Sequence, residues 1–191
     1  MEESRPVRAI YRYAFLTRAS HWVWVLAFAV LVSSGLQIFN ASPRLDASDK
    51  SDAARRVLAI ESPEDGVGTT TLFGRTFVTT GWLGWTDDGM GSRGAHAFPA
   101  WLTIPGYQDL AGGRRWHLFF AWVATVCWLA WLLSAALKGS LREMVLRPSD
   151  LPKLWPMQAY YLKLRKTPPP HGTYNPLQKA AYTLVMFAIA P

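Results

Sequence analysis

Residues 19–43 read ASHWVWVLAFAVLVSSGLQIFNASP and contain no Asp, Glu, Lys or Arg. A second stretch, residues 116–137, reads WHLFFAWVATVCWLAWLLSAAL and contains none of these residues either. Each exceeds the about 20 residues that a helix needs to cross a hydrocarbon core of roughly 30 Å. Both carry tryptophan near an end, where interfacial anchors are expected. We therefore predict membrane-spanning helices at 19–40 and 115–137, rather than buried helices of a soluble protein.

The segments that flank these spans decide how the ends of the chain are interpreted. Four arginines precede the first stretch, as in a signal peptide. A signal core, however, has about 7–15 apolar residues and a small-residue cleavage site, so we interpret this stretch as a retained helix. A third apolar run, 180–191, is too short to span a membrane. We interpret 177–191 as the start of a third span, and the chain as the front part of a longer protein.

Composition excludes several other classes of protein. The chain has 191 residues, of which 50% are hydrophobic and 17% charged, and it shows no repeat. Its single cysteine, Cys127, cannot form an internal disulfide, which excludes a disulfide scaffold. A soluble catalytic function is poorly supported, because the sequence has no nucleophile–base pair, phosphate loop or metal-spacing motif.

The charges sort by segment and predict the orientation of the chain. Residues 1–20 hold four Lys/Arg and two Glu, and residues 138–179 hold eight Lys/Arg and two acids. Residues 41–113 hold six Lys/Arg and nine acids. Cytoplasmic loops carry the Lys/Arg excess, so we expect a cytoplasmic N-terminus (1–18), a periplasmic loop (41–113) and a cytoplasmic loop (138–176). Nucleic-acid binding is the weaker interpretation of the basic charge, because no basic patch is interleaved with stacking aromatics.

The 41–113 loop is long for a connection between two helices and is expected to have structure of its own. Its part from 72 to 110 is rich in Gly, Trp and Pro and shows no helical periodicity. Residues 46–60 suggest a short amphipathic helix. Such a loop is suited to lie on the outer membrane surface or to dock a partner.

Two of the four histidines lie at span ends. His21 is at the inner end of the first span and His117 at the outer end of the second. Ionisable groups in membrane segments are usually functional, and neutral imidazole is a common axial ligand of haem iron. Gly35 shares a helix face with His21, about 21 Å further along the helix, and would let a flat macrocycle approach closely. The alternative is that both histidines are ordinary interfacial residues and that the glycine serves helix packing.

Three segments carry a resemblance to a known family. They are Arg18-Ala19-Ser20-His21-Trp22 with the following span, Arg115-Trp116-His117-Leu118-Phe119-Phe120-Ala121-Trp122, and Gly172-Thr173-Tyr174-Asn175-Pro176-Leu177-Gln178-Lys179. In this order they resemble the diheme cytochrome b subunits of the bacterial cytochrome b561 and Ni-hydrogenase type. That family includes the gamma subunit of membrane formate dehydrogenase and the cytochrome b subunit of thiosulfate reductase.

The resemblance implies four spans and two b-type haems, with His21 serving the inner haem and His117 the outer. The fourth span, which would supply both opposing ligands, is absent from this sequence. The resemblance also places Tyr174, Asn175, Gln178 and Lys179 near the inner haem and a quinone pocket. The alternative for these four residues is a helix start with a snorkelling lysine.

These observations together predict an all-α transmembrane helical bundle in the bacterial inner membrane, with two full spans, the start of a third and a long outer loop. The expected function is electron transfer between the quinone pool and a peripheral redox subunit outside the membrane. A molybdopterin enzyme is the favoured partner, and a hydrogenase or formate dehydrogenase remains open. The chain would be the electron-transfer subunit rather than the catalytic one. The rival hypothesis is a non-redox membrane anchor or transporter fragment.

Overall fold

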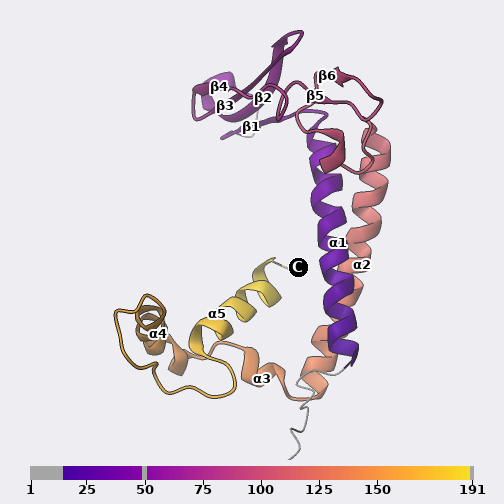
Figure 1. Cartoon of the computed structure of the whole chain (residues 1–191). Coiled ribbons are helices and arrows are strands. Elements are labelled where there is room, and N and C mark those ends of the chain that lie inside the picture. The colour runs from indigo at the N-terminus through magenta and orange to yellow at the C-terminus, as the bar shows by residue number, and fades with distance from the viewer. Residues whose placement is uncertain (1–14, 49–50, 190–191) are drawn as a thin grey trace, which may run out of the picture. The chain divides into compact units, whose positions relative to one another are not determined.

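The structure, a computed structural model, describes residues 15–48 and 51–189 (Figure 1). It divides into two compact units, and each unit contains part of both long helices. Trp24–Ala124 form one unit, which we call the sheet unit. Met1–Val23 and Thr125–Pro191 form the other, which we call the helical unit.

The two longest helices follow the two stretches that lack charged residues. Helix α1 covers Phe15–Phe39 (25 residues) and helix α2 covers Leu110–Leu137 (28 residues). Both exceed the about 20 residues needed to span a bilayer. They expose large apolar side chains, among them Leu26, Phe28 and Trp122, which a core helix of a soluble protein would bury. Length, composition and exposure therefore suit two membrane-crossing helices, over Thr17–Phe39 and Leu110–Leu137.

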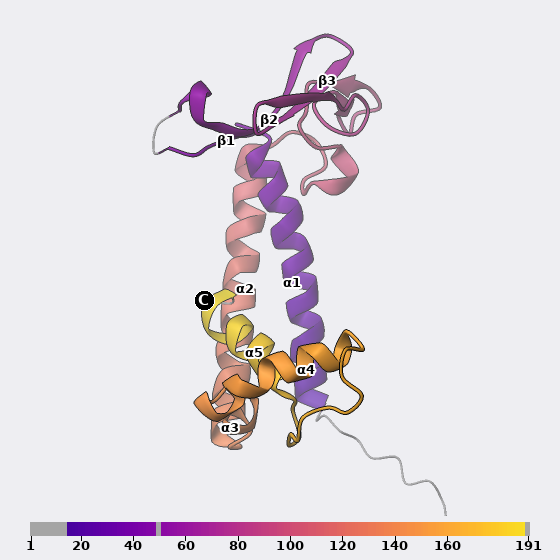
Figure 2. The same cartoon turned by 90° about the vertical axis from the view of Figure 1, so that its left-hand side faces the viewer.

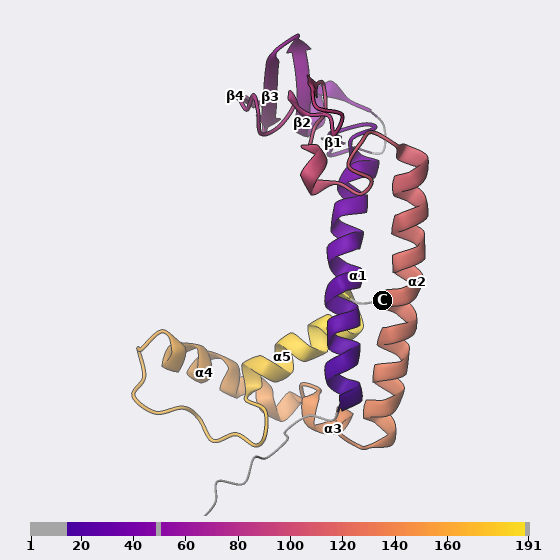
Figure 3. The ribbon, with the colours of Figure 1, turned by 45° about the vertical axis from the view of Figure 1, so that its right-hand side comes forward.

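In the sheet unit, the C-terminal part of α1 lies along the N-terminal part of α2 (Figure 3). Contacts at two levels establish this pairing: Gly35 lies against His117, and Gln37 lies against Gly113. In the helical unit, the thiol of Cys127 on α2 donates to the backbone oxygen of Ser20 on α1 (3.4 Å). Small residues at such contacts allow close approach of two helices in a membrane.

A four-stranded antiparallel sheet follows α1 in the sheet unit (Figure 2). Its strands β1 (Arg44–Asp46), β2 (Arg56–Glu64), β3 (Val67–Leu72) and β4 (Arg75–Val78) pair in chain order. The β3–β4 connection is a two-residue turn in which Phe73 (φ 47) and Gly74 (φ 77) both have positive φ. Two positive φ angles are typical of the tight turn that matches strand twist.

This sheet corrects two predictions from the sequence. The protein is not all-α, because the loop between the spans folds into strands. The expected amphipathic helix at 46–60 is also wrong, since the chain there ends β1, makes a single 3-10 turn η1 (Ala53–Arg55) and enters β2. Ala59 and Ile60 are buried, and β2 pairs with a threonine-rich strand whose branched side chains favour a sheet.

The rest of the segment between the two long helices forms turns and short elements. Strands β5 (Thr86–Asp87) and β6 (Arg93–Gly94) form a two-stranded ribbon, and η2 (Ala100–Leu102) is a 3-10 turn. Gly84 (φ +83) brings this segment against the sheet, because a side chain there would lie 2.9 Å from Gly68 Cα. The absence of helical periodicity in this segment agrees with its structure.

The helical unit continues after α2 with short helices. These are α3 (Leu141–Met144), η3 (Pro148–Lys153), α4 (Leu154–Tyr161) and α5 (Pro176–Leu184), which continues as the π-turn η4 (Val185–Ile189). Helices α4 and α5 lie beside each other (Figure 2). The hydroxyl of Thr183 on α5 accepts from the backbone N–H of Leu146 (2.8 Å). Helix α5 is therefore held to the segment that follows α2.

Candidate functional site

His117 lies on the second turn of α2 and packs on α1 in the sheet unit. A Cβ added at Gly35 would lie 3.6 Å from the Cε1 of its ring, an ordinary contact distance. The ring Nδ1 lies 3.1 Å from the hydroxyl oxygen of Ser34. Gly35, which was predicted to admit a macrocycle, therefore faces the histidine ring itself.

The hydrogen bonds of Ser34 indicate which ring nitrogen of His117 carries the proton. The Ser34 hydroxyl is buried and donates to the backbone oxygen of Val30 at 2.6 Å. A hydroxyl has one proton to donate and two lone pairs to accept with. Because the proton is used within α1, we assign Nδ1–H of His117 as the donor to Ser34. The neutral ring then carries its lone pair on Nε2.

This arrangement suits a metal ligand. A ligating histidine usually donates its second ring N–H to a nearby acceptor, which sets its tautomer. Among residues 15–48 and 51–189, none hydrogen-bonds Nε2 of His117. Imidazole nitrogen is a common axial ligand of haem iron. The donor set at His117 therefore fits a haem.

His21 presents a more open environment in the helical unit. Its ring is exposed on α1 and packs edge-to-face on Trp22, with ring centroids 6.0 Å apart. No described residue hydrogen-bonds either of its ring nitrogens. In the same unit, the indole N–H of Trp128 is buried and lacks a partner within the described part of the chain. Buried donors are nearly always satisfied in native proteins, so this indole is an exception among the described side chains.

The two histidines lie in different units, His21 in the helical unit and His117 in the sheet unit. His96 and His171 lie outside the long helices: His96 lies between β6 and η2, and His171 lies between α4 and α5. The ring of His171 is exposed beside the backbone oxygen of Gly172 (2.9 Å). The described residues also contain no cluster of three or more His, Cys, Asp or Glu side chains able to hold a metal ion.

The four residues predicted to contact a quinone gather at the start of α5. Asn175 and Gln178 form a reciprocal cap, in which each side-chain oxygen accepts from the backbone N–H of the other residue. Such a cap satisfies two donors that a helix start leaves free. The ring of Tyr174 packs edge-to-face on Tyr182. Side-chain oxygens of two of the four residues are thus used by the helix start.

Two residues that contact this cluster, Asp150 and Tyr161, were not predicted from the sequence. The ammonium of Lys179 donates to the carboxylate of Asp150 (3.0 Å), and the amide of Asn175 donates to the hydroxyl of Tyr161 (3.1 Å). The hydrogen bond from Lys179 lowers the pKa of Asp150, and the Arg147 backbone N–H also lowers it, whereas burial acts in the opposite direction. A sequence signal existed, because Asp150 is one of only two acids among eight basic residues in 138–179.

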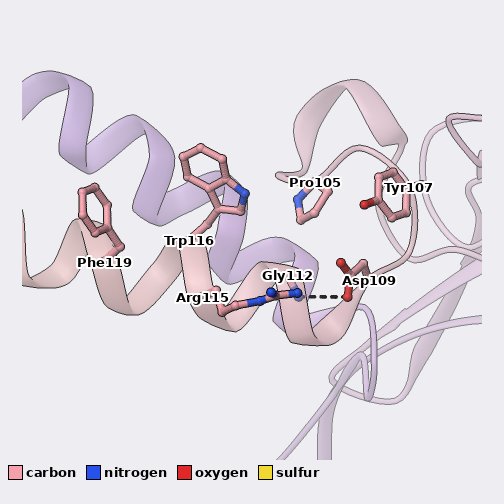
Figure 4. A pocket seen from close by; sticks show the side chains of 7 residues that line it. All are labelled: Pro105, Tyr107, Asp109, Gly112, Arg115, Trp116 and Phe119. Carbon is pink, nitrogen blue, oxygen red and sulfur yellow. Dashed lines mark hydrogen bonds between the residues drawn. The ribbon is translucent and has the colours of Figure 1, made fainter.

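An open hollow of about 500 Å³ lies at the start of α2 (Figure 4). The Asp109 carboxylate accepts from the Gly112 backbone N–H (2.8 Å) and so caps the helix. Trp116 and Phe119 extend the lining along α2 on a different face from His117. The lining residues are Pro105, Tyr107, Asp109, Gly112, Arg115, Trp116 and Phe119. Sequence reasoning did not find this hollow, because its residues come together only through the loop before α2.

Comparison with known protein families places these features in context. The family model described as prokaryotic cytochrome b561 matches residues 12–190 of the chain. The match therefore includes both long helices, the sheet and α5. Comparisons with curated proteins and with solved structures found no match.

Proposed function

The chain belongs to the prokaryotic cytochrome b561 family, and from this premise we propose that it passes electrons between the quinone pool and a redox enzyme outside the membrane. Family membership makes it a membrane b-type cytochrome that binds haem b and transfers electrons. The finer proposal concerns its ligands, its orientation and its two partners.

We assign His21 and His117 as axial ligands, each to one of two b-type haems. The observation that carries the assignment of His117 is the hydrogen bond between its Nδ1 and Ser34, which leaves Nε2 available. The assignment of His21 rests on its exposed ring in the first long apolar helix. Haem b supplies a one-electron couple at its iron when bound. The chain's own residues hold and orient it: His117 is set by Ser34, and Gly35 leaves room beside the ring.

We propose that the N-terminus and the 138–176 segment face the cytoplasm of a bacterium with an inner membrane. Lys and Arg exceed acids in both segments, whereas the 41–113 segment is net acidic. The sheet then lies outside the membrane, where it is suited to contact a peripheral enzyme. His117, which follows this segment directly, would serve the haem on the outer side.

A quinone is proposed to bind at the start of α5. The Gln178 amide nitrogen is not used by the cap, and the Lys179 ammonium has two further N–H bonds besides the one to Asp150. Both groups donate, as the carbonyl oxygens of a quinone require. Tyr174 and Asn175 would support the pocket, through ring packing on Tyr182 and through the cap.

We favour a molybdopterin enzyme as the peripheral partner, with a hydrogenase or formate dehydrogenase as alternatives. In each case the chemistry on the substrate belongs to the partner, and this chain supplies electron transfer. Copurification of the complex from native membranes, followed by assay of the three activities, separates these partners.

The test of the proposed function is a difference spectrum. Native membranes that contain the full chain should show a b-type alpha band on addition of a quinol, and the band should fade when the partner's oxidised substrate is added. No b-type band with quinol or with dithionite would reject the proposal. That result would favour the alternative of a non-redox membrane protein.

A further inference from the structure

We infer that Ser34 is a positioning residue for the haem ligand His117: its hydroxyl accepts the Nδ1–H bond and thereby holds the ring with Nε2 as the free ligating nitrogen. This inference rests on the proposed role of His117 as a ligand. It goes further, because it proposes that a side chain on the other helix, Ser34, controls how the His117 ring is oriented and how strongly it donates electrons to the iron.

The direction of the two hydrogen bonds carries the inference. The distance from Ser34 Oγ to Val30 O is 2.6 Å, whereas Oγ lies 3.1 Å from His117 Nδ1 and 3.2 Å from Leu31 O. The shortest contact is the one in which Oγ must be the donor, because a carbonyl oxygen only accepts. We therefore assign Nδ1 as the donor to Ser34, because a hydroxyl has a single proton and the shortest contact uses it on Val30 O.

Burial makes this hydroxyl a fixed acceptor. Ser34 is 0% exposed, so water does not compete for its lone pair. Its rotamer is held by the bond back to its own helix, a common arrangement for serine in membrane helices. Its neighbour Gly35 presents no side chain to the ring. The imidazole is consequently held by one hydrogen bond and by close packing.

The packing of α1 on α2 keeps this contact in register. Gln37 is 2% exposed, and its amide donates to the backbone oxygen of Tyr107 (2.8 Å). Its Cγ would lie 2.9 Å from a Cβ added at Gly113, one turn before His117. The hydrogen bond and the close packing of Gln37 thus fix how α1 lies on α2, one turn from the Ser34–His117 hydrogen bond.

The bond has a consequence for the haem. Donation from Nδ1–H to an acceptor raises the basicity of the opposite nitrogen. A more basic ligand favours the ferric state, so removal of the acceptor should raise the midpoint potential. Loss of such a supporting partner typically weakens a metal site by about 10- to 100-fold.

The experiment uses the full natural chain in its complex, with variants Ser34→Ala, Ser34→Thr, Ser33→Ala and His117→Ala. Threonine keeps a hydroxyl that can bond the carbonyl four residues earlier. Ser33 is the matched control, because it is the adjacent serine on α1 and only its backbone oxygen makes a described contact, with the Ile104 N–H. The measurements are haem content, transfer of haem to apomyoglobin, redox titration and the low-spin ferric resonance spectrum.

We expect Ser34→Ala to release one haem about tenfold faster, raise the midpoint potential of that haem and alter its ferric spectrum. Ser34→Thr should restore all three properties, and Ser33→Ala should match the wild type. The inference is overturned if Ser34→Ala matches the wild type, if Ser33→Ala shifts equally, or if the threonine variant behaves like alanine. The His117→Ala variant distinguishes failure of the proposed ligand from failure of the proposed role of Ser34. If His117→Ala retains both haems, His117 is not a ligand. If His117→Ala loses one haem while Ser34→Ala matches the wild type, only the role of Ser34 is rejected.

Discussion

At the scale of single residues, buried polar side chains on α1 decide how α2 packs against it. Ser34 and Gln37 are almost completely buried, and each makes a hydrogen bond to the segment 107–117. Buried polar groups are costly unless they are paired. These two side chains therefore specify one register of the helix pair more sharply than the surrounding Val and Leu side chains do.

Two glycines at this contact should respond differently to alanine. A Cβ at Gly113 would approach the Gln37 Cγ to 2.9 Å, whereas one at Gly35 would lie 3.6 Å from the His117 ring. We expect Gly113→Ala to destabilise the protein by about 1–3 kcal/mol through overpacking. Gly35→Ala should leave stability nearly unchanged and alter the haem spectrum. Thermal unfolding in detergent checks both, and equal stability of the two variants would contradict the packing described.

The side chain of Gln178 has two proposed roles, capping of α5 by its oxygen and quinone binding by its amide N–H, and these roles can be tested separately. Gln178→Glu keeps the side-chain oxygen that accepts from Asn175, and Glu serves a capping box as well as Gln does. It removes the amide N–H that we assign to the quinone. The KM for quinol should rise several-fold, while helix content and haem spectra stay unchanged. An unaltered KM in steady-state oxidation of a quinol analogue would leave Gln178 as a capping residue only.

At the scale of elements, the two long helices could be predicted and the sheet could not. A mainly apolar run of more than 20 residues without a charged side chain can be recognised from its composition alone. Residues 57–60, in contrast, form a short apolar run that suits a strand or a helix equally well. The strand is decided by the pairing of residues 58–60 with residues 70–72, which no local pattern reveals.

Helix α5 is anchored by an ion pair whose strength should depend on pH. The pKa of Asp150 is lowered chiefly by the hydrogen bond from Lys179, so it lies below the unfolded value of about 3.9. A carboxylate of this kind contributes its full stability above the unfolded pKa and loses it as the pH falls through the folded pKa. The stabilisation should therefore be nearly constant from pH 8 to 5 and should be lost progressively as the pH falls below about 4.

Comparison of the wild type with Asp150→Asn checks this dependence. The wild type should unfold at a higher temperature from pH 8 to 5, because the variant leaves the Lys179 ammonium without its anionic partner. The two midpoints should converge in the acid range. A difference that stays unchanged after the carboxylate has been protonated would contradict a contribution from its charge.

At the scale of the whole molecule, the sequence located the histidines but not their surroundings. His21 and His117 could be singled out because ionisable groups are rare in apolar spans. The contact of His117 with Ser34 joins residues 83 positions apart, and the pair of Asp150 with Lys179 joins residues 29 apart. Such contacts depend on the packing of elements, so they become visible only in the folded chain.

The charge distribution and the fold support one functional account of the molecule. The acidic segment between the spans forms a sheet and turns of its own, while the basic segment that follows α2 forms short helices around the start of α5. In the proposed orientation, the first is available to a peripheral enzyme and the second to a quinone at the cytoplasmic side. The two histidines, one in each unit, would hold the haems that connect them.

The most direct test of this account is the haem content of histidine variants of the full natural chain, purified in its complex. A pyridine haemochromogen assay on His21→Ala and on His117→Ala should each find about half of the wild-type haem b, and the double variant should hold almost none. Retention of the full haem content by both single variants would contradict the account.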